Sequence, residues 1–286
     1  MFPSISGFFR QILELVNEVT VTERQQQLPG APAPADLWDP TWGENKEPTE
    51  ECLLTVLRHV AELNDYRCRG VFAEPENDNV TKIHVLILGP VGTPYEGGFF
   101  HFVLQCPPDY PSRPPLVRLM TTDSGRVRFN PSIYENGKVC MAVLGTDTTE
   151  STWTRNHSIG DVVAAIRGLL ENENPIAEGS AFGVIPAVGT WLNKGIRYNA
   201  VLQHETIRVA VCDMVEDCLG GSSSFPDTLK DVVLKQFPQF YGQYEKVVRE
   251  RLPMTGAAMN DASYGGVVTF QYETLLARLR DLRERV

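Results

Sequence analysis

The chain has 286 residues, of which 42% are hydrophobic and 22% are charged, and its formal net charge is −10. This is the composition of a soluble globular protein, and its apolar runs are far shorter than the roughly 20 residues that a membrane-spanning helix needs. The excess of acidic side chains disfavours non-specific attraction to phosphate backbones and anionic lipids. We therefore expect no nucleic acid and no membrane among the partners.

The cysteine pattern and the N-terminal sequence indicate an intracellular protein. The six cysteines form no CxxC pair, and no histidine lies at zinc-finger spacing from them. Neither a metal site nor a disulfide framework is expected from this pattern. The N-terminal run MFPSISGFFRQILELVNEV lacks the basic start of a secretory signal. We expect free thiols and a cytoplasmic location, with the nucleus as a second compartment.

The N-terminal part, 1–36, is predicted to be an amphipathic helix followed by a linker. Apolar side chains recur at roughly helical spacing over 7–23. The run QLPGAPAPADLWDPTW that follows is rich in Pro and Ala. Both a docked helix and a mobile, partner-facing arm are compatible with this pattern.

The next unit, 37–185, is predicted to contain a helix, a sheet and a second helix. The first helix is expected over 50–66, with its apolar stripe formed by Leu53, Leu54, Leu57, Val60 and Leu63. Three runs rich in β-branched and aromatic residues then predict strands, namely VTKIHVLIL, GFFHFVLQC and PLVRLMT. The Gly- and Pro-rich connections between them are short, which indicates an antiparallel meander.

A helix after Ser158 is predicted from its apolar spacing and from the capping box that Ser158 forms with Asp161. The last unit, 186–286, is predicted to be a helical C-terminal extension, with helical patterns over 199–219, 227–252 and 269–286. These helices could cover the core or serve as a partner platform. We favour covering.

Cys140 is the residue whose surroundings raise the question of function. It follows a bend at Asn130 and the tight-turn dipeptide Asn136-Gly137. A cysteine here can be a small core residue, because free cysteine is often buried. No histidine lies within 16 residues of it, and Lys138 is the cation near it in sequence. We therefore expect a thiol pKa close to the ordinary value of about 8.5.

Such a thiol would suit acyl exchange better than hydrolysis. It could accept an acyl group from another thioester, which is a nearly isoenergetic exchange. Without a neighbouring base to activate water, it would hydrolyse that acyl group slowly. A cysteine hydrolase is therefore disfavoured.

The motifs around Cys140 resemble those of the ubiquitin-conjugating enzymes. GTPYEGG, YPSRPP and FNPSIYENGKVC occur in the order and spacing of that family, followed by a tryptophan and the helix after Ser158. The runs RFNP, NGKVC and LGT, and especially HETIRVAVCDM, are similar to the Z-type members of the family. The resemblance extends over most of the chain from Trp38 onward.

This resemblance implies an α+β fold, a four-stranded antiparallel meander flanked by helices, with Cys140 in a shallow groove. It implies that Cys140 accepts ubiquitin or a ubiquitin-like modifier from a ubiquitin-activating enzyme as a thioester. The modifier would pass to a lysine amine of a substrate protein, with or without a ubiquitin ligase. No cofactor is implied, because the activating enzyme uses the ATP. The alternative is a catalytically weak or silent relative that acts as a ubiquitin-binding adaptor.

The sequence departs from the family pattern just before the cysteine. Where the family has His-Pro-Asn, this chain has Asn130-Pro131-Ser132. The family's Asn is assigned to the oxyanion of the tetrahedral intermediate, so Ser132 is the candidate at the oxyanion position and Asn130 a candidate residue of the active-site loop. Loss of one well-aimed oxyanion donor costs on the order of 3 kcal/mol, about a hundredfold in rate. The alternative is that Ser132 only caps a turn.

The sequence also lacks acidic residues at the positions where the family has groups that orient or deprotonate an incoming lysine. The family's acidic gate position falls at Ala177, and Ala142 stands where the family often has Asp or Ser. The loop after the cysteine is longer than in minimal members and carries Asp147 and Glu150. These carboxylates could influence the protonation of the amine, or simply line a solvated loop.

The resemblance also implies where partners bind. The activating enzyme is expected to contact the helix over 50–66. Ligases are expected to contact the turns around 95–97, 107–115 and 153–156. Trp153 itself is expected to be a packing anchor rather than a recognition residue.

Overall fold

The computed structural model describes residues 39–40, 46–65, 70–147, 151–172, 188–221, 225–261 and 266–286. All of them belong to one compact unit, Pro34–Val286. The predicted helix and linker at 1–36, and the predicted positions Ala177 and Glu150, lie outside these residues. Within the described part, no helix is both long enough and apolar enough to cross a membrane.

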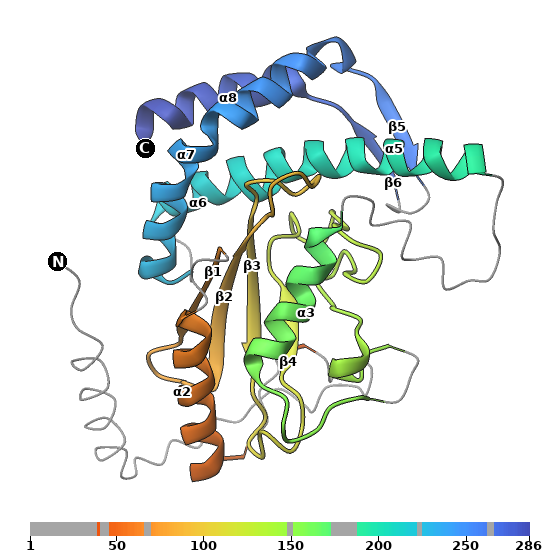
Figure 1. Cartoon of the computed structure of the whole chain (residues 1–286). Coiled ribbons are helices and arrows are strands. Elements are labelled where there is room, and N and C mark those ends of the chain that lie inside the picture. Colours follow the sequence, from red (N-terminus) through yellow and green to blue (C-terminus); the bar gives the residue numbers. More distant parts are fainter. Residues whose placement is uncertain are drawn as a thin grey trace. The chain divides into compact units, whose positions relative to one another are not determined.

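Four strands form an antiparallel meander in the order β1-β2-β3-β4 (Figure 1). They are β1 (Val71–Pro75), β2 (Lys82–Leu88), β3 (Phe99–Gln105) and β4 (Leu116–Leu119). The three predicted strands and their antiparallel pairing are confirmed. The four-stranded meander that the resemblance implies is also confirmed. The residue pattern did not locate β1, because its run VFAEP is short and ends in acidic and proline residues that are rare in strands.

The central strands are buried on both faces. Every residue of β2 from Ile83 onward is buried, and so is every residue of β3 up to Leu104. An antiparallel strand with one solvated face would alternate between buried and exposed positions. C-terminal residues supply part of the cover, since the ring of Phe225 lies 4.6 Å from that of His101. The C-terminal region and the sheet therefore share one hydrophobic core, as expected for a covering role.

Helix α2 (Glu50–Asp65) confirms the predicted first helix, but its buried face differs from the predicted one. Leu54, which the pattern assigns to the apolar stripe, is 56% exposed. The buried side chains of α2 include Cys52, Val56, Val60 and Leu63. The buried face of α2 begins at Cys52, and a cysteine is a weak hydrophobic signal in a sequence. The predicted stripe, which was read from leucines, is therefore rotated slightly from the buried face.

Helix α3 (Ile159–Glu171) begins at the predicted capping box. The Asp161 amide donates to Ser158 Oγ at 3.1 Å, and the Ser158 amide donates to Asp161 Oδ2 at 2.7 Å. Both amides at the helix start are satisfied by this reciprocal pair. The start of α3, and hence the position of its apolar face, is fixed by local sequence.

The C-terminal region is mainly helical, as predicted. Its elements are α5 (Val188–Glu205), the π-helix η4 (Thr206–Asp213), α6 (Met214–Gly220), α7 (Asp227–Arg251), the 3-10 turn η5 (Leu252–Met254), β5 (Ala258–Asp261), β6 (Gly266–Thr269) and α8 (Tyr272–Arg285). The π-helix interrupts the predicted helix over 199–219, and the sequence did not predict the β5-β6 hairpin. Helical periodicity alone does not reveal a widened turn, which depends on packing with other elements.

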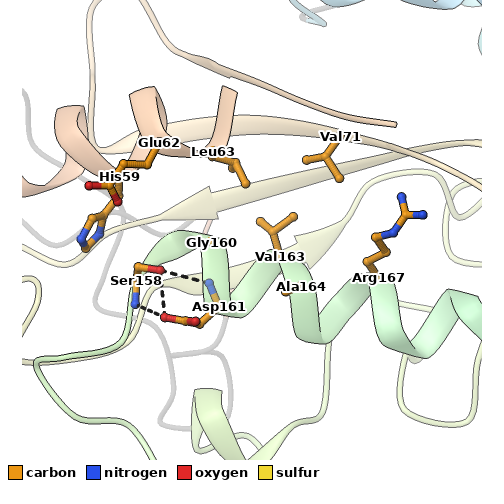
Figure 2. Close-up of a pocket in the computed structure, with 10 residues that line it drawn as sticks. All are labelled: His59, Glu62, Leu63, Val71, Ser158, Gly160, Asp161, Val163, Ala164 and Arg167. Carbon is orange, nitrogen blue, oxygen red and sulfur yellow. Dashed lines mark hydrogen bonds between the residues drawn. The ribbon is translucent and has the colours of Figure 1, made fainter. Parts of the chain in front are cut away.

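A pocket of about 470 Å³ lies between α2 and α3 (Figure 2). Figure 2 shows its lining side chains, which include His59, Glu62, Asp161 and Arg167 around an apolar floor. Cys140 is not among the residues that line it. This pocket is therefore separate from the predicted thioester site.

Candidate active site around Cys140

Cys140 lies on a short hairpin that runs from Asn130. The Cys140 amide donates to the Ser132 carbonyl at 2.8 Å, and Ile133 pairs with Val139 in an antiparallel bridge. Both Ile133 and Val139 are fully buried. Because side chains alternate along extended chain, Ser132 and Cys140 face away from the core and lie opposite each other. Such cross-strand partners have Cβ atoms about 4.5–5.5 Å apart.

The hairpin turns at the predicted Asn136-Gly137 dipeptide. The Gly137 amide donates to the Tyr134 carbonyl at 2.9 Å and closes the turn. The Leu119 amide of β4 donates to the Gly137 carbonyl, also at 2.9 Å. The segment that carries Cys140 is thus hydrogen-bonded to the sheet.

Asn130 connects this hairpin to α3. The residue is 4% exposed, its Nδ2 donates to the Leu169 carbonyl at 3.0 Å, and its Oδ1 accepts from the Ser132 amide at 2.9 Å. These contacts place Asn130 in the loop that bears the cysteine, and its part in the reaction stays a prediction. Ser132 takes part in this arrangement through its main chain, because its amide donates to Asn130 and its carbonyl accepts from the Cys140 amide.

The Cys140 thiol differs from the other described thiols in its exposure. Cys140 is partly exposed, whereas Cys52, Cys106, Cys212 and Cys218 are buried. Its Sγ donates to the Thr146 carbonyl at 3.2 Å. The alternative that Cys140 is only a small core residue is therefore not supported by its position.

The surroundings of the Cys140 thiol favour its protonated form. Partial burial raises the pKa of Cys140, and the carboxylate of Asp147 raises it further, against the opposing charges of Lys138 and Arg128. This corrects the expectation of an ordinary pKa, because the sequence reveals Lys138 but not the desolvation. No histidine in the described residues acts on this thiol, which agrees with the argument against a hydrolase.

The chain after Cys140 folds back onto it. Ala142–Leu144 form the single 3-10 turn η3, and Gly145 ends it in the left-handed conformation, with φ 63°. The Gly145 amide donates to the Ala142 carbonyl at 3.0 Å. This reversal brings Thr146 beside Cys140, a contact that the sequence did not predict because a threonine after a glycine is too common to be a signal.

Trp153 packs against the segment after β3. Its Nε1 donates to the Pro111 carbonyl at 2.9 Å, and its ring lies 5.5 Å from that of His157 and 6.0 Å from that of Tyr110. These contacts agree with the expected role as a packing anchor.

The turn after Trp153 lies next to two other segments that are predicted to meet partners. Arg155 Nη1 donates to Ser112 Oγ at 2.8 Å, and its Nη2 pairs with Glu51 on α2. One arginine thus links α2, the turn over 107–115 and the turn over 153–156. Three of the four predicted partner segments are therefore adjacent in space.

Comparison with known proteins identifies the family. The family model described as ubiquitin-conjugating enzyme matches residues 55–181. Ubiquitin-conjugating enzyme E2 Z of Xenopus tropicalis is 41% identical over 256 residues, which are 88% of this chain and 78% of that protein. The chain belongs to the ubiquitin-conjugating enzyme family.

The chain is similar to further relatives as well. Ubiquitin-conjugating enzyme E2 Z of Homo sapiens is 42% identical over 272 residues, which are 91% of this chain and 73% of that protein. A solved E2 domain of a Toxoplasma gondii ubiquitin conjugating enzyme has 24% identity and a TM-score of 0.41, covering 54% of this chain and 96% of that one. The resemblance inferred from the motifs, including that to Z-type members, is confirmed by the sequence relatives, and the fold class is that of the family.

Proposed function

We propose that this ubiquitin-conjugating enzyme carries ubiquitin or a ubiquitin-like modifier as a thioester on Cys140 and transfers it to a lysine amine of a substrate protein. The observation that carries the proposal is the exposure of this thiol, opposite Ser132, while the four other described cysteines are buried. The names of the relatives support ubiquitin as the first modifier to test.

The proposed reaction has two acyl-transfer steps. First, Cys140 Sγ bonds to the carbonyl carbon of the modifier's C-terminal glycine, the activating enzyme's thiol leaves, and the Cys140 proton passes to that thiol or to solvent. Second, a lysine nitrogen bonds to the same carbon, Cys140 leaves, and the amine proton is returned to the sulfur or to solvent. A thiol with a raised pKa is a poor leaving group, which slows wasteful hydrolysis as well as transfer.

The proposed partners are the activating enzyme at α2 and ligases at the adjacent turns. Arg155 supports this arrangement, because it ties the turn over 153–156 to Ser112 and Glu51. We propose a cytoplasmic location with the nucleus as a second compartment, which fractionation of cells that express the tagged chain would test. The free thiols are compatible with a reducing compartment.

A gel assay tests the role of Cys140. The full chain is incubated with a ubiquitin-activating enzyme, ATP and ubiquitin, and samples are run with and without reductant. We expect an adduct that reductant removes, that Cys140→Ala abolishes, and that Cys140→Ser converts into a reductant-resistant ester. Cys218→Ala, which removes a buried thiol, should leave the adduct in place.

Two results would count against the proposal. An adduct that persists in Cys140→Ala would place the thioester on another residue. The absence of any adduct, across a panel of activating enzymes and modifiers, would favour the adaptor alternative, which nothing in the described part of the chain supports.

A further inference from the structure

Thr146 makes hydrogen bonds to the Cys140 thiol and to the peptide groups beside it. Its Oγ1 donates to the Val139 carbonyl at 2.6 Å and accepts from the Met141 amide at 3.0 Å. Its own carbonyl accepts from the Cys140 thiol at 3.2 Å. One residue thus binds the peptide groups on both sides of the cysteine and the sulfur itself.

We propose that Thr146 is a positioning residue for the reaction at Cys140, an inference that rests on the proposed function. Its hydroxyl fixes the backbone of Cys140 between Val139 and Met141. Its carbonyl oxygen fixes the direction of the S–H bond, and therefore the side from which the sulfur meets the incoming thioester.

The local sequence explains how Thr146 reaches this place. The turn at Ala142–Leu144 reverses the chain, and Gly145 completes the reversal with a positive φ that other residues adopt at a cost. A Cβ at Gly145 would also lie 2.9 Å from Ser151 Cβ. The loop after Cys140 therefore turns back on itself, and its residue Thr146 contacts Cys140 again.

The two kinds of contact differ in what happens to them during the reaction. A carbonyl accepts a hydrogen bond only from the protonated thiol, so this contact is lost when the sulfur is deprotonated or acylated. The two hydroxyl bonds involve backbone groups and are independent of the state of the sulfur. Thr146 can therefore hold the cysteine backbone through both transfer steps while releasing the sulfur.

The test compares two substitutions of different chemistry in the full chain. Thr146→Val keeps the shape of the side chain but removes the hydroxyl, and Thr146→Ser keeps the hydroxyl. Thr152→Val, at an exposed position of the same loop, is the matched control. Two quantities are measured, namely the rate of thioester formation and the pH profile of Cys140 alkylation by iodoacetamide, read by peptide mass spectrometry.

We expect opposite effects of Thr146→Val in the two assays. Thioester formation should fall at least about tenfold, because small displacements of a reacting atom have effects of that size. Alkylation by the small reagent should become faster near neutral pH, since loss of the hydroxyl bonds loosens the loop that holds the Thr146 carbonyl against the thiol, and the thiol becomes more exposed. The other groups that act on this thiol are unchanged in all three variants; they are Asp147, Lys138, Arg128 and Tyr134.

Thr146→Ser should restore both rates to near the wild-type values, and Thr152→Val should leave them unchanged. Continued protection of Cys52, Cys106 and Cys212 from alkylation would show that the variants are folded. The proposal is overturned if Thr146→Val matches wild type in both assays, or if Thr146→Ser loses as much as Thr146→Val. If wild type forms no thioester, the proposed function fails, while the alkylation profile still decides whether Thr146 positions the thiol.

Discussion

At the scale of single residues, the site is defined by the pairing of Ser132 with Cys140 across the hairpin. The hydrogen bond between the Cys140 amide and the Ser132 carbonyl sets this register. A longer side chain at 132 would extend over the same face toward the sulfur. The departure from the family's Asn therefore lies directly across the hairpin from Cys140.

Replacing Ser132 by Asn should keep or raise the rate of transfer to lysine, by as much as about a hundredfold, because an amide reaches further as an oxyanion donor than a hydroxyl does. Transfer to free cysteine, a better nucleophile, should change less. Both rates are measured by single-turnover discharge of the loaded enzyme. A marked loss in Ser132→Asn would show that the serine has a role of its own, and Ser132→Ala would tell whether the hydroxyl provides it.

Asp147 is expected to lower the reactivity of the Cys140 thiol. Its carboxylate raises the pKa of Cys140, so Asp147→Asn should lower that pKa and increase the thiolate fraction at any pH below it. The rate of alkylation at pH about 7.5 should rise about two- to threefold, the size of a screened surface interaction. Glu135→Gln removes an exposed charge on the same hairpin and should have no effect. Equal alkylation rates in Asp147→Asn and wild type would show that Asp147 does not lower the reactivity of the thiol.

Residues differ in how far the sequence can predict them. Cys140, Ser132 and Asn130 stand in a motif of fixed spacing, so the order of residues alone makes them candidates. The raised pKa of Cys140 does not follow from that order, because its largest cause is burial, which depends on the folded loop. Thr146 was missed for the same reason, since its contacts exist only after Gly145 has reversed the chain.

At the scale of elements, Asn130 couples the hairpin to α3. Its amide group satisfies the Leu169 carbonyl near the end of the helix and the amide of Ser132 in the loop. A shift of α3 would therefore be transmitted to the residue opposite the cysteine.

Asn130→Ala should lower the free energy of unfolding by about 2 kcal/mol, because it leaves two partly buried backbone groups without their partner. Urea unfolding of the two proteins gives this difference. Asn136→Ala, which removes a hydrogen bond at the exposed turn of the same hairpin, should cost no more than about 0.5 kcal/mol. Equal losses in both variants would mean that the buried contacts of Asn130 contribute nothing beyond those of a turn residue.

Elements with strong local signals are predicted well. The capping box at Ser158 indicates the start of α3, and the alternation of Gly- and Pro-rich turns indicates the meander. The predicted buried face of α2 is wrong at Leu54, since which side of an apolar helix is buried depends on its neighbours. The π-helix over 206–213 lies within a helical pattern, and nothing in its local sequence separates it from the flanking turns.

At the scale of the whole described unit, the C-terminal region shares one hydrophobic core with the sheet. Tyr244 of α7 donates its hydroxyl to the Gly97 carbonyl at 2.6 Å, in the segment before β3. A Cβ on the neighbouring Gly98 would lie 2.8 Å from Thr206 Cγ2 of η4. The two glycines of the GTPYEGG motif thus permit the close approach of the C-terminal helices in this chain.

This covering makes stability depend on pH. Burial, together with the positive charges near it, lowers the pKa of His101 from 6.5 to about 3. Its Nε2 lies 2.9 Å from Nδ1 of His84, which Glu76 contacts from the other side, and Phe225 packs on its ring. His101 stays neutral in the folded chain and is protonated in the unfolded chain below about pH 6.5.

The free energy of unfolding should therefore fall by about 2 kcal/mol between pH 7 and pH 5 through His101 alone. His84, whose pKa is also lowered by burial, adds to this loss. His101→Gln cannot take up a proton and should have a flatter pH dependence than wild type, as measured by urea unfolding at several pH values. Parallel curves for the two proteins would show that His101 is not the group responsible.

The hydrogen bond from Leu119 to Gly137 has a further consequence. β4 is the last strand of the sheet, and a terminal strand with unpaired amides can recruit strands from other molecules. The segment that bears the nucleophile occupies part of that free edge. Substitutions that detach this segment from β4 would expose the strand's edge to pairing with other molecules. The same substitutions should therefore cause both aggregation and loss of activity.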